Sequence, residues 1–202
     1  MLEAFIHGII LAFGLILPLG VQNVFVFNQG ATQPSFIRAL PVVLTASICD
    51  SLMILLAVLG VSIVVFSFTW LKTTLIVVGV FFLLYMGWSL WKTKPGSIKT
   101  DDTSFSPKKQ VMFAASVSLL NPHAILDIVG VIGTSSLNYE DNEKWMFTIA
   151  TIVVSWLWFL GLALAGKLVR SFNESGNWIL YMNKLSALIV WGTAIYLVVS
   201  NF

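Results

Sequence analysis

The chain has 202 residues, of which 58% are hydrophobic and 10% are charged, and its formal net charge is +2. Since an ordinary soluble domain has about a quarter charged residues, this composition excludes a soluble globular protein. The lone Cys49 excludes an internal disulfide and any mechanism that needs a pair of thiols. The composition therefore predicts an all-α, polytopic membrane protein.

Six apolar stretches are each long enough to cross a bilayer, which takes about 20 residues, and together they leave no room for a soluble domain. The N-terminus has no basic segment and no small-residue cleavage pattern, so we expect the first stretch to be a retained helix. A polar turn is expected at 28–35, after the first helix. The predicted transmembrane helices cover residues 4–27, 39–66, 70–91, 111–135, 145–168 and 178–199.

The positive charges are divided unequally between the two sets of loops. Six helices place both termini on one side, and the loops of that side and their flanks contain only Lys72 and Lys144. By the positive-inside rule, residues 93–110 form a cytoplasmic loop and both termini lie outside. The loops and flanks of the other side contain Arg38, Lys92, Lys94, Lys99, Lys108, Lys109, Lys167, Arg170 and Lys184.

A weak internal repeat relates the two halves of the chain. Shifting the sequence by 104 to 106 positions aligns Pro18 with Pro122 and Asn23 with Asp127, and brings Asp50 near Ser155. The chain is thus predicted to be a single membrane domain, 1–202, made of a three-helix unit at 1–92 and a second at 111–202. An odd number of helices per unit inverts the second unit, which gives a 3+3 inverted repeat. Inverted repeats with Pro- or Gly-interrupted helices at matching positions indicate a transporter binding site near the midplane.

The fourth predicted helix is interrupted by the segment Asn121-Pro122-His123. Asn121 before Pro122 has the form of an N-cap followed by proline at the first helical position, so a half-helix with a positive end is expected to start here. His123 and Asp127, four residues apart, would share a face of that half-helix. Alternatively, Pro122 only kinks the helix and Asp127 caps a neighbouring backbone group.

The first predicted helix has an equivalent interruption at Pro18 and Gly20. Two neutral amides, Gln22 and Asn23, follow it where the second half carries a carboxylate. Amide side chains can hydrogen-bond both the α-carboxylate and the α-amine of an amino acid. The alternative is that they join transmembrane helices to one another.

Asp50 is a second acidic residue in the middle of a predicted transmembrane helix. An intramembrane carboxylate costs at least about 2.5–3.5 kcal/mol, and no lysine or arginine lies near the middle of any predicted helix. Because burial disfavours the charged form, we expect the missing cation to come from outside, as a substrate or a proton. A structural role is the alternative. Trp156, Trp158 and Trp191 could offer aromatic faces to a cation, although such residues mostly pack or anchor membrane helices.

Together these segments resemble the lysine exporter (LysE) family, most closely its lysine and arginine exporting branch. The resemblance spans nearly the whole chain and implies proton-driven export of amino acids, mainly basic ones, across a bacterial inner membrane. Val21 stands where the arginine branch is expected to have proline, which widens the choice of substrate to other amino acids. The resemblance rests on Leu17-Pro18-Leu19-Gly20-Val21-Gln22-Asn23, Asn28-Gln29-Gly30, Asp50, Leu120-Asn121-Pro122-His123, Asp127 and Ser155-Trp156-Leu157-Trp158-Phe159.

Two other functions compete with this interpretation. Cys49, Asp50, His123 and Asp127 could coordinate a divalent metal that is exported, although the loop at 93–110 has no His or Cys. Paired aspartates could also form an intramembrane protease, but no Gly-x-Gly-Asp sequence surrounds either one. We therefore expect a transporter rather than an enzyme, with an amino acid, protons and the lipid bilayer as partners. We expect no cofactor and no nucleic acid, and leave a homo-oligomer open.

Overall fold

The computed structural model of the chain describes residues 1–17, 20–61, 69–92 and 105–172, together with isolated positions between 181 and 199. Within these ranges the chain is helical and has no β-strand. The all-α prediction is therefore confirmed for the described part of the chain. The predicted sixth helix at 178–199 falls mostly outside it.

The first predicted helix is two helices, α1 (Leu2–Ile16) and α2 (Val21–Thr32), which meet at an angle of 80°. Pro18 lies outside the described residues, and Gly20 is the extended residue before α2. The polar turn predicted at 28–35 is wrong for most of its length, because α2 continues to Thr32. Tertiary packing stabilises this continuation, since the backbone of Gly30 lies directly against the carbonyl group of Ala163.

The second predicted helix is α3 (Phe36–Leu56), followed by a short π-helix, η1 (Ala57–Val61). Ser35 begins α3 as its N-cap and accepts a hydrogen bond from the backbone N–H of Arg38. The third predicted helix is α5 (Thr69–Trp91), which begins one residue before its predicted start.

The fourth predicted helix is broken into short pieces of different geometry. It begins as α6 (Pro107–Leu119), and it resumes as α7 (Pro122–Ile125), η2 (Leu126–Gly133) and η3 (Ser136–Asn138). The predicted loop at 93–110 is wrong for its last four residues, because Ser106 caps a helix that starts at Pro107. η2 is a π-helix and η3 a 3-10 helix, so α-helical geometry is not restored after the interruption. The fifth predicted helix is α8 (Asp141–Phe172), which begins earlier than predicted because Asp141 and Glu143 suit the positive end of a helix.

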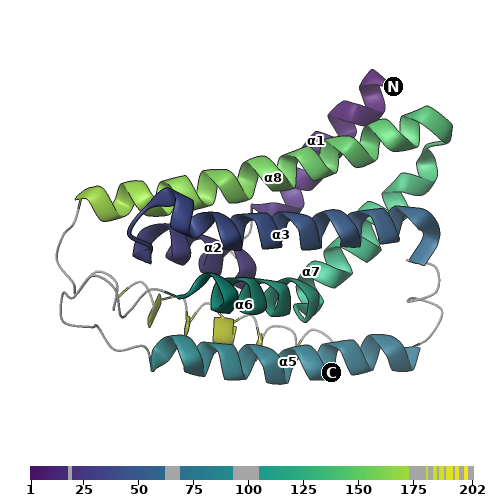
Figure 1. Cartoon of the computed structure of the whole chain (residues 1–202). Helices are drawn as coiled ribbons and strands as arrows, with labels where there is room; N and C mark the ends of the chain where they lie inside the picture. Colours follow the sequence, from purple (N-terminus) through teal and green to yellow (C-terminus); the bar gives the residue numbers. More distant parts are fainter. Residues whose placement is uncertain are drawn as a thin grey trace.

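α8 is the helix against which α1, α2 and α3 pack, and α5 lies on the far side of α6 from it (Figure 1). Small residues allow the backbones to approach closely. Gly8 of α1 lies against Phe147 and Ala150 of α8, and Gly166 of α8 lies against Phe27 of α2. The interrupted α1–α2 unit is thus fixed along the length of α8.

Two described helical segments, Phe36–Gly60 and Asp141–Val169, are long and apolar enough to cross a membrane. A third span results if the bent pair α1 and α2 is counted as one. The described part of the chain is therefore that of a helical membrane protein.

Candidate functional site

Asp50 lies inside the helix bundle, with a side chain only 7% exposed. Its Oδ1 accepts a hydrogen bond of 2.8 Å from Nε2 of Gln22, in the first turn of α2. Its Oδ2 accepts one of 2.9 Å from the hydroxyl group of Ser155, on α8. Three helices therefore meet at one carboxyl group, and both donors are neutral.

The polar contact between α3 and α8 continues at the next residue of each helix. Nε1 of Trp156 donates a hydrogen bond of 3.0 Å to the hydroxyl of Ser51, which itself donates to the carbonyl of Ser47. The hydroxyl of Ser47 is fully buried and has no hydrogen-bond partner among the described residues. Burying an unpaired hydroxyl costs about 1–3 kcal/mol, so Ser47 is an unsatisfied polar group on the helix that carries Asp50.

The first helix interruption is closed by its own side chains. Nδ2 of Asn23 donates a hydrogen bond of 2.8 Å to the carbonyl of Ile16, one of the carbonyls left unpaired where α1 ends. Gln22 meanwhile points to Asp50 and brings the positive end of α2 towards the carboxyl group. Asn23 therefore joins the end of α1 to the start of α2, and Gln22 belongs to the surroundings of Asp50.

At the second interruption, Asn121 is buried and accepts the backbone hydrogen bond of Ile125 through its carbonyl group. This is the N-terminal position predicted for Asn121, one residue before Pro122. Asp127 is half-buried in the first turn of η2. The side chains of Pro122 and His123 lie outside the described residues, and so does the predicted shared face of His123 and Asp127.

The neighbours of the two aspartates share one hydrophobic cluster. Met53 and Ile54, one turn after Asp50, pack in the same buried cluster as Ile128 and Val129, which directly follow Asp127. The structure thus brings Asp50, Gln22 and Trp156 into one network. It also places η2, which follows the second interruption, against α3, the helix of Asp50, and against η1.

The other two tryptophans pack within the protein. Trp158 makes an edge contact with Phe13, at 6.4 Å between ring centroids, and Trp191 lies against Gly87 and donates to the carbonyl of Leu84. Neither is hydrogen-bonded to the network around Asp50. Of the three tryptophans singled out, Trp156 is the one joined to this network.

Sequence reasoning did not select Ser155 as a site residue, although the repeat alignment already brought it near Asp50. It also missed a group of buried amides at the other end of α2. Nε2 of Gln33 donates to Oε1 of Gln29 and to the carbonyl of Phe105, and Nε2 of Gln110 donates to the carbonyls of Phe105 and Arg38. These bonds fix the starts of α3 and α6 to the end of α2.

The fold and the buried polar network define a helical membrane protein with a polar site inside its bundle. Residues 13–201 match the family described as LysE type translocator, so the chain belongs to the LysE family of translocators. The family assignment made from sequence is therefore confirmed. It makes the protein a membrane transporter.

Similar proteins extend over nearly the whole chain. The "Putative amino-acid transporter YisU" of Bacillus subtilis (strain 168) is 55% identical over 100% of this chain and 91% of its own length. "Arginine exporter protein ArgO" of Enterobacter sp. (strain 638) is 31% identical, over 98% of this chain and 94% of its own length. The protein of the same name from Escherichia coli (strain K12) is 30% identical over the same shares. No solved structure matches this chain.

Proposed function

We propose that this protein exports basic amino acids, lysine and arginine above all, in exchange for protons. The observation that carries the proposal is the environment of Asp50. This carboxyl group is buried in the bundle and held by two neutral donors, and no ion pair to it is present among the described residues. Because a buried carboxylate without a cation is unfavourable, a guanidinium or ammonium group from the substrate, or a proton, supplies the missing charge.

In the proposed complex, Asp50 and Asp127 attract the cationic end of the substrate. The two interrupted helices, at Gly20–Asn23 and at Asn121–His123, bind its α-carboxylate and α-amine. When the cation leaves, a proton replaces it on the carboxyl groups, and this alternation couples export to proton entry. Gln22 and Ser155 keep the Asp50 carboxyl group in place during the exchange.

The proposal includes a 3+3 inverted repeat with its axis near Asp50, and two sets of residue separations support it. α1 begins at residue 2 and α6 at 107, while α3 begins at 36 and α8 at 141, a separation of 105 residues in both cases. The Asp50–Ser155 and Ser51–Trp156 hydrogen bonds also join residues that are 105 apart. Residues next to a two-fold axis contact their own symmetry equivalents, so both bonds are expected of residues on the pseudo-symmetry axis.

The proposed setting is a bacterial inner membrane crossed six times, with residues 93–110 in the cytoplasm and both termini outside. The two relatives named as arginine exporters favour a basic substrate. Export of other amino acids is the alternative, because Val21 departs from the sequence expected of the arginine branch. Export of divalent metals is the other alternative, since Cys49, Asp50, His123 and Asp127 offer ligands for a metal ion.

The deciding experiment is an efflux assay on cells that express the protein, preloaded with labelled amino acids or divalent metals. We expect lysine and arginine to leave several times faster than from cells without the protein, and export to fall when the proton gradient is collapsed. Export of a metal with no export of any amino acid would contradict the proposal. Export confined to neutral amino acids would refute the basic substrate.

A further inference from the structure

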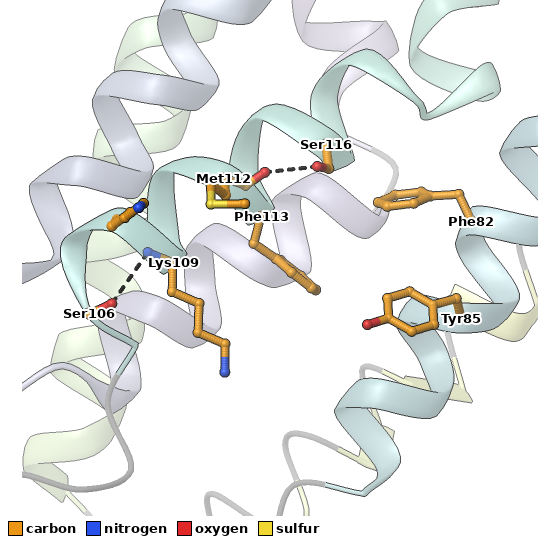
Figure 2. A pocket seen from close by; sticks show the side chains of 8 residues that line it. Phe82, Tyr85, Ser106, Lys109, Met112, Phe113 and Ser116 are labelled. Atoms are coloured by element: carbon orange, nitrogen blue, oxygen red, sulfur yellow. Dashed lines mark hydrogen bonds between the residues drawn. The ribbon is translucent and has the colours of Figure 1, made fainter.

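A hollow lies away from Asp50, between α5 and α6 (Figure 2). Its volume is about 340 Å³, within the usual range for small-molecule sites. Its lining residues are Phe82, Tyr85, Ser106, Lys108, Lys109, Met112, Phe113 and Ser116. None of these residues belongs to the network around Asp50.

One end of this α5–α6 cavity is cationic and the other is apolar. Lys108 and Lys109 lie in the first turn of α6, both exposed, and none of the eight lining residues is acidic. In Figure 2 the ring of Phe113 points into the space that Phe82 faces from α5. The ring of Phe113 also packs on Phe25, at 4.5 Å between centroids, so this wall is anchored in the core of the protein.

Residues near the cavity are of the kind found where lipid headgroups meet acyl chains. α5 ends at Trp91, and Nζ of Lys92 lies 4.7 Å from the ring centroid of Trp88, a combination typical of a membrane interface. Ser116 lies about 11 Å deeper than the two lysines of α6, at a rise of about 1.5 Å per residue. The cationic end of the cavity therefore lies at the depth of a lipid headgroup. The apolar end lies at the depth of the first part of an acyl chain.

The cavity opens towards the outside of the bundle. The side chain of Tyr85 is 67% exposed and that of Met112 is 62% exposed, and both residues lie in segments that the sequence predicts to be transmembrane. An occupant would therefore enter from the surrounding lipid. Basic pockets between transmembrane helices bind anionic headgroups. Because this cavity has two lysines, its charge complements an anionic phospholipid better than a zwitterionic one.

We propose that the α5–α6 cavity binds an anionic phospholipid, with its phosphate held by Lys108 and Lys109 and one acyl chain lying against Phe82, Met112 and Phe113. The hydroxyl groups of Tyr85 and Ser106 are additional hydrogen-bonding groups at the cationic end. The bound lipid would join α5 to α6. The proposal does not depend on which substrate the protein transports.

Native mass spectrometry of the purified full-length protein in detergent, with equal amounts of phosphatidylglycerol and phosphatidylcholine, tests this proposal. We expect the wild-type protein to retain phosphatidylglycerol preferentially. Lys108→Gln with Lys109→Gln should weaken its retention about tenfold or more, since each lysine near an anionic headgroup contributes about 1 kcal/mol. The charge-matched control, Lys144→Gln with Lys167→Gln, should retain the lipid as the wild type does.

Two further measurements distinguish a lipid in the cavity from a free phosphate ion and from a lipid held by surface charge alone. Ser116→Leu keeps both lysines but fills the apolar end, and it should also reduce retention of phosphatidylglycerol. Inorganic phosphate added in large excess should not displace the lipid. Equal retention by the lysine variant and its control, undiminished retention by Ser116→Leu, or displacement by inorganic phosphate would each overturn the proposal.

Discussion

The two interrupted helices are built in opposite ways. At the first, side chains close the gap: Asn23 caps the carbonyl of Ile16 and Gln22 binds Asp50. At the second, the backbone itself leaves α-helical geometry and forms the π-helix η2 and the 3-10 helix η3. Because such segments often mark functional hinges, we expect the first interruption to be a fixed wall of the site and the second to be the part that moves.

The largest expected effect is the loss of either carboxylate. Asp127 lies in the interruption that we expect to move, and Asp50 lies beside the one that we expect to stay fixed. Replacing either with Asn removes a carboxyl group that is proposed to attract the substrate and to carry the proton. We predict that each substitution lowers export of labelled arginine from dipeptide-fed cells tenfold or more. Glu140→Gln, an exposed acid in the loop before α8, is the control and should export normally. A variant that exports at the normal rate removes that aspartate from the proposed site.

The second prediction tests how firmly the first interruption is anchored. A Cβ added at Gly30 would lie 2.2 Å from the carbonyl oxygen of Ala163, so Gly30→Ala forces α2 away from α8. Overpacking of this kind costs about 1–3 kcal/mol, and we predict that the melting temperature of the purified protein falls by several degrees. Gly161→Ala is the matched control, because nothing lies within 4 Å of its added Cβ. Equal melting temperatures for the two variants would contradict close packing of α2 on α8.

The third prediction concerns the link between the fixed interruption and Asp50. Gln22→Leu leaves Oδ1 of Asp50 without its donor, and a buried acceptor left without a partner costs about 1–3 kcal/mol. We expect lower stability in detergent and slower arginine export. Gln22→Glu, which keeps the shape of the side chain but adds a negative charge next to Asp50, should reduce arginine export further. If Gln22→Leu has full stability and full export, Gln22 is no part of the site.

The smallest expected effect lies outside both interruptions, where the hydroxyl of Tyr139 is hydrogen-bonded to Nδ1 of His7 at 2.8 Å. Tyr139→Phe should cost about 0.5–1.5 kcal/mol of stability and leave export unchanged. Partial burial, then the carboxylates of Glu3 and Glu143, raise the pKa of Tyr139. The folded protein therefore holds the phenol proton of Tyr139 more tightly than the unfolded chain does. The resulting stabilisation is complete below the ordinary pKa of tyrosine, and it is lost as the pH rises through the raised pKa of the folded protein. This loss of stability at high pH should be absent in Tyr139→Phe. If the stability of that variant depends on pH as the wild type does, Tyr139 is not the group that titrates.

The sequence predicted the helical fold because apolar length is a local signal. It placed the start of α5 to within one residue. It ended the first helix too early, because the contact that keeps Gly30 helical comes from Ala163, far along the chain. The π-helix at Asp127 also has no local signature in the sequence.

For the candidate site, the sequence selected Asp50 because a carboxylate is unusual in an apolar segment, and the structure places that side chain inside the bundle. The partners Gln22 and Ser155 depend on how three helices meet, which periodicity does not determine. The offset of the internal repeat was the available signal for Ser155. It pairs Asp50 with Ser155 at the separation of 105 residues that their hydrogen bond spans.

The most direct test of a cation-binding carboxylate compares arginine with citrulline, which has the same shape but a neutral side chain. Labelled arginine counterflow into proteoliposomes should be inhibited at least tenfold more strongly by unlabelled arginine than by citrulline. In Asp50→Asn and Asp127→Asn proteins, any residual counterflow should no longer distinguish the two inhibitors. Equal inhibition of the wild-type protein by both, or an unchanged preference for arginine in both variants, would contradict recognition of the substrate cation by these carboxyl groups.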